Sequence, residues 1–259
     1  MIHSSLAPCV LCVPVFRDFR VFPGSVFEYF PLFTKDRHAE RGKRERGAEF
    51  IWEAMQNSDA FILIGGRSSR LGADKAFVMI GGRTLMQRAV DTARVALPDA
   101  RITAVAGNET QFALQAVAAG VRFIFDLHEG RGPLGGLHAA LADARTPWVF
   151  VLACDYPFVS PELIGRLVDR ISDEHGAVVP QQDDGRLQPL CAFYRVDDAL
   201  PLVEEFIVRP RPSPSMREIV DRLNPLIVRV DEYSHLPGSE NFFININTIE
   251  DLENARRRT

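Results

Sequence analysis

The chain has 259 residues, of which 46% are hydrophobic, and a formal net charge of −4 at pH 7. This composition is sufficient for one large or two small domains with a full core. The negative charge excludes a global basic field for nucleic acid, and the longest apolar run near the middle, Trp148 to Cys154, is too short to cross a bilayer. The four cysteines include Cys9 and Cys12 as a C-x-x-C without a second pair at zinc spacing, so we expect a reduced, cytoplasmic setting.

Residues 1–54 differ in composition from the rest of the chain. They hold seven of the 18 phenylalanines and a mixed charged run from Lys35 to Arg46, without a clear helix or strand period. We interpret them as a disordered extension or as the product of a start codon assigned too early. Residues 55–259 are then one self-contained domain that begins at Met55.

Strand and helix patterns alternate after Met55. In chain order, the sequence predicts a strand at Ala60–Ile64, a helix at Thr84–Leu97, a strand at Ile102–Ala106, a helix at Gln111–Ala119, a strand at Val121–Phe125, a helix at Leu137–Ala144, a strand at Trp148–Ala153 and a helix capped by Ser160. This alternation predicts an α/β fold with a mostly parallel sheet between two layers of helices.

The pattern changes after about residue 176. Ala177–Pro180 and Leu187–Arg195 read as paired strands around the turn Asp183-Asp184-Gly185. Leu226–Val230 and Phe242–Ile246 read as further strands, and Thr248 begins a last helix with a capping box. We therefore expect additional antiparallel strands in the C-terminal half.

Four predicted strand ends carry residues suited to a ligand: Gly65-Gly66, Gly107-Asn108, Asp126 and Asp155. In open α/β sheets, ligands bind beyond the carboxyl ends of the strands. We therefore expect these four ends to line one cleft.

The first of these ends opens a glycine-rich loop that runs to Lys75. From Met55 onward the chain contains 21 arginines and one lysine, which is Lys75. Exposed amides after Gly65-Gly66, with the charges of Arg70 and Lys75, suit a triphosphate. The spacing is not that of a Walker A loop. The alternative is a solvated turn with surface charges.

Two carboxylates at strand ends are candidates for cation and nucleotide contacts. Asp155 follows a buried strand and precedes Pro157, where a carboxylate would hold Mg²⁺ together with phosphate oxygens; a helix cap or an ion pair is the alternative. Asp126 could accept donors from a guanine edge or a ribose, or be an ordinary turn aspartate. The second glycine-rich loop, Gly130 to Gly136, would let a base pack on bare backbone, or be a tight turn before a helix.

Several motifs resemble one known family. The segment LIGGRSSRLGADK, residues 63–75, resembles the signature loop of nucleotidyltransferases with a Rossmann-like fold. With GPLGG at 132–136, CDYP at 154–157 and FININT at 243–248, the chain is similar to the molybdenum cofactor guanylyltransferase (MobA) family over residues 58–258. The resemblance implies a three-layer α/β/α Rossmann-like nucleotidyltransferase fold.

The resemblance also implies a reaction: GMP passes from GTP to the terminal phosphate of molybdopterin, with Mg²⁺ as cofactor and pyrophosphate as the second product. It makes Arg70, Lys75 and Asp155 catalytic, with Asp155 as the metal ligand. The residues implied to bind the nucleotide are Leu63, Ile64, Gly65, Gly66, Lys75, Asp126 and Asp155, and those implied to bind the acceptor are Gln188, Asn245 and Asn247. One departure is Ala106, which stands where some members have a nucleotide-contacting asparagine.

Two alternatives stay open at this point. One is a related nucleotidyltransferase that uses CTP on the molybdenum cofactor or acts on a sugar phosphate, although such proteins more often have Ala-Gly after the first strand. The other is a nucleotide-binding regulator without catalytic activity. The implied partners are the two substrates and, transiently, proteins that insert or accept the cofactor; we expect no nucleic acid or membrane partner.

Overall fold

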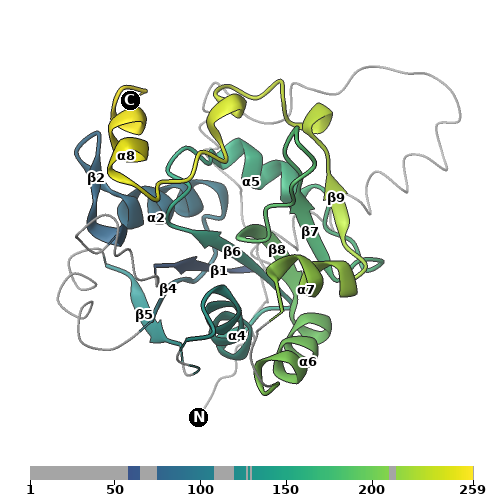
Figure 1. Cartoon of the computed structure of the whole chain (residues 1–259). Helices are drawn as coiled ribbons and strands as arrows, with labels where there is room; N and C mark the ends of the chain where they lie inside the picture. Colours follow the sequence, from purple (N-terminus) through teal and green to yellow (C-terminus); the bar gives the residue numbers. More distant parts are fainter. Residues whose placement is uncertain are drawn as a thin grey trace, which may run out of the picture. The chain divides into compact units, whose positions relative to one another are not determined.

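A computed structural model of the chain describes residues 58–64, 75–107, 120–126, 128, 130–209 and 214–258. Its main feature is a seven-stranded sheet with the order β5-β4-β1-β6-β8-β7-β9 (Figure 1). The strands of this sheet are β1 (Ser58–Leu63), β4 (Ile102–Ala106), β5 (Arg122–Phe125), β6 (Trp148–Ala153), β7 (Ala177–Pro180), β8 (Cys191–Arg195) and β9 (Leu226–Val228). A separate two-stranded ribbon consists of β2 (Met79–Ile80) and β3 (Arg83–Thr84).

The first four strands of the sheet, β5, β4, β1 and β6, run parallel to one another. Strand β8 is antiparallel to both of its neighbours, β6 and β7, and β9 runs parallel to β7. The sheet is therefore mostly parallel, and its antiparallel pairings lie in the C-terminal half.

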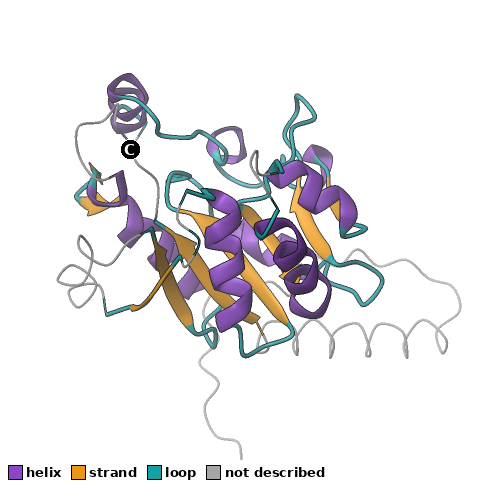
Figure 2. Cartoon of the chain, turned by 60° about the horizontal axis from the view of Figure 1, so that its bottom comes forward, coloured by secondary structure: helices purple, strands orange, loops and turns teal. Residues whose placement is uncertain are grey.

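Helices cover both faces of the sheet (Figure 1, Figure 2). One face packs against α2 (Leu85–Ala96), α5 (Pro161–Val168) and α8 (Ile249–Arg256), and the other against α4 (Pro133–Asp143), α6 (Val196–Ile207) and α7 (Met216–Arg222). Three short 3₁₀ helices complete the described elements: η2 (Lys75–Phe77), η3 (Val230–Glu232) and η4 (Ser239–Asn241).

Alternate residues of each strand supply two separate cores. In β1, Ala60 and Ile62 belong to the core beneath α2 and α5, whereas Phe61 and Leu63 belong to the core beneath α4 and α6. Because both faces are buried, central strands need apolar residues at every position, which is why β6 reads as a continuous hydrophobic run. The three-layer α/β/α fold predicted from the sequence is confirmed.

The predicted strand at Phe242–Ile246 is wrong. These residues form a turn followed by irregular backbone, and the amide of Ile246 donates to the carbonyl oxygen of Asp155 at 3.1 Å. Phe242 and Ile246 are buried in the core. Their apolar pattern therefore reflects core packing and not a strand ladder.

The second glycine-rich loop is shorter than predicted, because helix α4 begins at Pro133 and not at Leu137. Proline is suited to the first turn of a helix, since its fixed φ is compatible with helical backbone and its missing amide would have had no intrahelical partner. Gly135 and Gly136 consequently lie in the first turn of α4. Helices α6 and α7 were not predicted from the sequence.

Some predictions concern parts of the chain that the structure does not describe. These are the boundary between residues 54 and 55 and the helix at Gln111–Ala119, which stay predictions. Among the helices that are described, none has the length and apolar character needed to cross a membrane.

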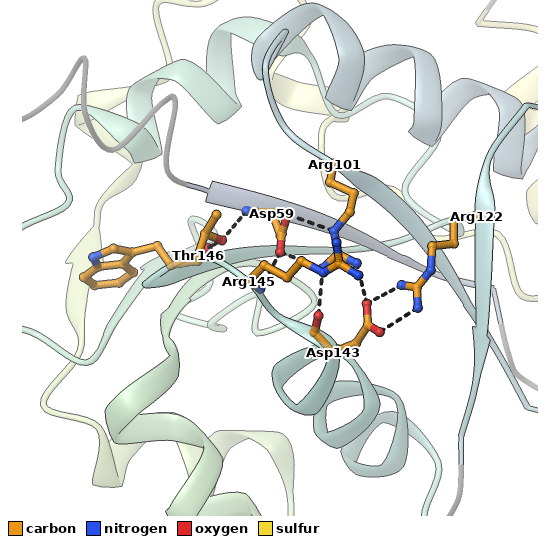
Figure 3. Close-up of polar contacts among 7 residues, drawn as sticks. Asp59, Arg101, Arg122, Asp143, Arg145 and Thr146 are labelled. Carbon is orange, nitrogen blue, oxygen red and sulfur yellow. Dashed lines mark hydrogen bonds and ion pairs between the residues drawn. The ribbon is translucent and has the colours of Figure 1, made fainter.

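An ion-pair network ties together the edge of the sheet where the parallel strands begin (Figure 3). Asp59, in β1, is 2% exposed and accepts hydrogen bonds from Arg101 Nη2 at 2.8 Å and from the Arg145 amide at 2.8 Å. Arg101 also donates to Asp143 Oδ2 at 2.9 Å, and Arg122 Nη2 donates to Asp143 Oδ1 at 2.8 Å. The network thus joins β1, β5, the residue before β4 and the end of α4.

Replacing Asp143 with asparagine is expected to lower the free energy of unfolding by about 2 kcal/mol at pH 6, because charge-assisted hydrogen bonds are lost. The hydrogen bond from Arg122 is the main reason why the pKa of Asp143 is lowered in the folded chain. A carboxylate with a lowered folded pKa stabilises the fold above its unfolded pKa of about 3.9, and this contribution disappears as the pH falls through the folded pKa. Urea unfolding of both proteins at pH 6 and pH 3 should show the difference shrinking; an equal difference at both pH values would contradict this role.

Candidate functional site

The carboxyl edge of the parallel strands brings distant residues together. The Cys154 amide donates to the Leu63 carbonyl oxygen at 3.0 Å, and the Asp126 amide donates to the Ala106 carbonyl oxygen at 2.9 Å. These backbone hydrogen bonds extend the pairing of the strands by one residue. As a result, Leu63, Asp126 and Asp155 lie along the same edge of the sheet, as the sequence predicts.

Lys75 is the centre of a polar cluster at this edge. Its Nζ donates to Asp155 Oδ2 at 2.8 Å, to Asn247 Oδ1 at 2.7 Å and to Asn245 Oδ1 at 3.3 Å. An ammonium group has three donors, so these contacts occupy all of them. The Lys75 side chain is 12% exposed. Four of the residues proposed from the sequence therefore form one site, although Asn245 and Asn247 are 170 and 172 positions away from Lys75.

Backbone contacts hold the two asparagines in place. Ile246 between them is fully buried, and its amide donates to the Asp155 carbonyl oxygen. On the C-terminal side, the Asn247 amide donates to Asp251 Oδ2 at 2.9 Å, and this bond is the main reason why the pKa of Asp251 is lowered. Burial of the residue between the asparagines and capping of α8 together direct both amide oxygens to Lys75.

The two oxygens of Asp155 have different surroundings. Oδ2 accepts from Lys75, whereas Oδ1 is buried and has no hydrogen-bond partner among the described residues. A buried carboxylate oxygen without a donor is costly, and a cation bound to it would remove that cost. No group of three or more His, Cys, Asp or Glu side chains able to hold a metal occurs in the described part of the chain. This donor set fits Mg²⁺, which is commonly held by one or two carboxylates together with phosphate oxygens and water.

Asp126 lies against the first turn of α4. Its Oδ1 accepts from the His128 amide at 2.7 Å, and a Cβ atom on Gly135 would lie 2.2 Å from its Oδ2. Burial raises the pKa of Asp126, and the bond from His128 opposes that shift. A Cβ atom on Gly136 would lie 3.3 Å from Leu63. The glycines were predicted to allow close approach of a ligand; the neighbours that the structure places there are the Asp126 carboxylate and Leu63.

The sequence predicts that Asp126 contacts a guanine nucleotide. On that prediction, replacing Gly135 with alanine is expected to raise the KM for GTP about tenfold, because the new methyl group displaces the carboxylate of Asp126, and a hydrogen bond to a charged group contributes about 1.5–3 kcal/mol. The carboxylate can rotate away, so the free energy of unfolding should fall by less than about 1 kcal/mol. Gly165→Ala is the matched control, since Gly165 is also helical and a Cβ atom there meets nothing within 4 Å. Equal KM values for the two variants would contradict a role of Asp126 in nucleotide binding.

Other residues proposed from the sequence have different positions. Leu63 and Ile64 are 7% and 2% exposed and belong to the two cores, so their nucleotide contact stays a prediction. Gly65, Gly66 and Arg70 lie outside the described residues, and their roles also stay predictions. Ala106, where some relatives have asparagine, is buried at the end of β4.

Gln188 is not one of the three side chains to which Lys75 donates. It is linked to the Lys75 cluster through Tyr156. The Tyr156 hydroxyl donates to Gln188 Oε1 at 2.9 Å, and the Gln188 amide donates to Gln182 Oε1. Tyr156 lies in the CDYP motif, from which no role was predicted for it. Its position directly after Asp155 was the available signal.

The histidines near Asp126 were also left without a role. His128 and His138 have ring centroids 4.7 Å apart in an edge-to-face arrangement. Burial is the main cause that lowers the pKa of His138, and the neighbouring His128 lowers it further. Their spacing of ten residues gives no helical signal, because His128 precedes α4 and His138 lies within it.

Comparison with known proteins identifies the family of the chain. The model of the MobA-like NTP transferase domain matches residues 60–225. The chain is 32% identical over 202 residues to the molybdenum cofactor guanylyltransferase of Desulfosudis oleivorans, covering 78% of this chain and 95% of the relative. It is 31% identical over 198 residues to a protein of Methanocaldococcus jannaschii named "Probable molybdenum cofactor guanylyltransferase", covering 74% of this chain and 94% of the relative.

A solved structure agrees with these sequence matches. Molybdopterin-guanine dinucleotide biosynthesis protein A from Archaeoglobus fulgidus superimposes with a TM-score of 0.65 at 28% identity, over 77% of this chain and 97% of that protein. The region matched by the family model includes Lys75 and the strands β5 and β6, which precede Asp126 and Asp155. The chain therefore belongs to the MobA-like NTP transferase family.

Proposed function

We propose that this chain is a nucleotidyltransferase that transfers GMP from GTP to the terminal phosphate of molybdopterin and releases pyrophosphate. The observation that carries the proposal is the convergence of Lys75, Asp155, Asn245 and Asn247 at the carboxyl edge of the sheet. A nearly buried ammonium beside a carboxylate with one oxygen that has no hydrogen-bond donor is a suitable environment for a triphosphate and its cation. The names of the relatives, which mention molybdenum cofactor guanylyltransferase, support this choice of substrates.

The sheet order supports a direction for the nucleotide along the edge. Asp126 follows β5 and Asp155 follows β6, and three inter-strand spacings separate these strands. At about 4.8 Å each, the spacings amount to roughly 14 Å. We infer that the guanine or ribose lies near Asp126 and Gly135, and that the phosphates lie near Lys75.

A divalent metal is generally used by nucleotidyltransferases of the MobA family. We assign the role to Mg²⁺ held by Asp155, whose Oδ1 has no hydrogen-bond partner among the described residues. When bound, the ion would neutralise charge on the phosphate oxygens of GTP.

The chain's own residues position the reactants and neutralise charge. An oxygen of the terminal phosphate of molybdopterin forms a bond to the α-phosphorus of GTP. The bond from that phosphorus to the bridging oxygen breaks, and its electron pair leaves with pyrophosphate. Because the attacking phosphate is already anionic, no general base is required. Lys75 stabilises the charge that develops around the α-phosphate, and we assign the departing pyrophosphate to Arg70.

We also propose a cellular compartment and protein partners for the chain. Cys191 is a free, buried thiol among the described residues, and we propose a reduced, cytoplasmic compartment. Proteins that insert or accept the finished cofactor would make transient contact with the chain.

A pyrophosphate-release assay tests the proposal. Purified protein is incubated with Mg²⁺ and either GTP or CTP, with and without molybdopterin. We expect release that requires molybdopterin and is at least tenfold faster with GTP than with CTP. Faster release with CTP would indicate a cytidylyltransferase, and nucleotide binding without release would indicate a regulator; either result would contradict the proposed function.

A further inference from the structure

A hydrogen-bonded chain links the Lys75 cluster to a β-turn on the other half of the sheet. The Tyr156 hydroxyl forms a hydrogen bond with the side chain of Asn245, and it donates a hydrogen bond to Gln188 Oε1 at 2.9 Å. Asn245 in turn accepts from Lys75 at 3.3 Å. The Gln188 amide donates to Gln182 Oε1, in the turn that precedes β8. Tyr156 is therefore the one described side chain that contacts both Asn245 and Gln188.

The hydroxyl of Tyr156 fixes the orientation of two amide side chains. Each amide has a donor end and an acceptor end, and only partners of the matching kind determine which end points where. Asn245 Oδ1 accepts from Lys75, which leaves the nitrogen end of that amide for the Tyr156 hydroxyl. Gln188 Oε1 accepts from Tyr156, so the nitrogen of Gln188 faces Gln182.

The position of these hydrogen-bonded residues indicates that they contact the acceptor substrate and not the nucleotide. In the sheet, β6 separates β1, β4 and β5, where Asp126 lies, from β8, β7 and β9. Tyr156 follows β6, and Gln182 and Gln188 lie between β7 and β8. Gln188 is 6% exposed, whereas Gln182 is half-buried. An array of oriented amides beside aromatic rings suits a polar heteroaromatic ligand such as a pterin.

We propose that Tyr156 is a positioning residue for the pterin-bearing acceptor, acting through the amide groups of Gln188 and Asn245. The inference rests on the proposed function and adds to it a residue that neither the sequence motifs nor the names of the relatives assign. Without the hydroxyl, Gln188 Oε1 loses its donor in a buried position, and the amide of Asn245 is free to turn. A misoriented amide pair binds the acceptor more weakly and leaves the nucleotide side unchanged.

Tyr233 provides a matched control within the same aromatic cluster. Tyr156 and Tyr233 both meet the ring of Phe243 edge-to-face, with centroids 6.1 Å and 6.0 Å away. The Tyr233 hydroxyl donates to the carbonyl oxygen of Gln181 at 2.8 Å and not to a side-chain amide. Replacing either tyrosine with phenylalanine keeps the ring and removes one hydroxyl. Both hydroxyls donate to residues in the segment 181–188.

The test is a comparison of steady-state constants for the wild type, Tyr156→Phe and Tyr233→Phe with GTP and molybdopterin. Tyr156→Phe is expected to raise the KM for molybdopterin about tenfold, which corresponds to about 1.4 kcal/mol, with the KM for GTP changed less than twofold. Tyr233→Phe is expected to leave both KM values within twofold. Thermal unfolding of the three proteins verifies that each is folded at the assay temperature.

A double-mutant cycle with Gln188→Leu tests whether Tyr156 acts through Gln188. If it does, the double variant has an acceptor KM close to that of Gln188→Leu alone, because the second change removes a contact that is already lost. Additive effects, equal changes in both KM values, or an unchanged acceptor KM in an active Tyr156→Phe protein would overturn the inference. A folded wild-type protein that transfers no guanylyl group would overturn the proposed function itself, and the inference with it.

Discussion

Replacing Lys75 with alanine is expected to lower kcat/KM for guanylyl transfer by about 10²–10³, the usual loss when one preorganised electrostatic contact to a transition state is removed. Lys75 is the ammonium that joins Asp155, Asn245 and Asn247, and in the bound state one or more of these contacts would pass to a phosphate oxygen. The decrease should appear mainly in kcat, because the charge is needed most in the transition state. Steady-state pyrophosphate release measures it.

Lys75→Arg tests whether charge alone is sufficient. The side chain is 12% exposed and its Nζ lies within 3.3 Å of three oxygens, so a planar guanidinium would displace the charge from its present position. We expect Lys75→Arg to recover less than a tenth of the wild-type activity. Arg83→Ala is the control, because Arg83 is 62% exposed and its contact is an ion pair with Asp91 at the surface. Near-normal activity of Lys75→Ala would contradict the catalytic role.

Replacing Asp59 with alanine is expected to lower the free energy of unfolding by about 3–5 kcal/mol, as is usual when one partner of a buried ion pair is removed. The Asp59 side chain is 4% exposed and accepts two hydrogen bonds from Arg101 and one from the Arg145 amide. Its loss removes the acceptor of the Arg145 amide and leaves Arg101 with Asp143 as its remaining carboxylate. Urea unfolding gives the change in free energy.

The matched control for Asp59 is Asp91→Ala. Asp91 pairs with Arg83 at 2.9 Å, but its side chain is 42% exposed, and such surface pairs contribute about 0–1 kcal/mol. The two variants should therefore differ by at least about 2 kcal/mol in stability. A loss for Asp59→Ala no larger than that for Asp91→Ala would show that the network in Figure 3 contributes little to the fold.

The central sheet could be predicted because burial on both faces leaves a continuous signal in the sequence. Every residue of Trp148–Ala153 is buried, and the run of apolar residues therefore marks β6 without any knowledge of its neighbours. The same reasoning was wrong at Phe242–Ile246, because alternating apolar residues report burial and not the presence of a strand partner. A buried apolar segment forms a strand only if another segment of the chain pairs with its backbone. The local sequence does not show whether such a partner exists.

The site was predictable to the extent that it depends on strand ends. Asp126 and Asp155 follow strands whose direction was predicted, so a common edge followed from the fold class. The contact of Lys75 with Asn245 and Asn247 was not predictable from local pattern, because it depends on how the chain returns over the sheet before α8. The role of Tyr156 was missed for the same reason, since its partner Gln188 lies 32 residues away.

The most direct test of the account is the fate of labelled phosphates of GTP in a reaction with molybdopterin and Mg²⁺. Guanylyl transfer at the Lys75–Asp155 site requires cleavage between the α- and β-phosphates. We expect label at the α-position to appear in a molybdopterin–guanine dinucleotide, and label at the γ-position to appear in pyrophosphate. Transfer of the γ-label to the acceptor, or release of GDP with the α-label retained, would contradict the proposed reaction.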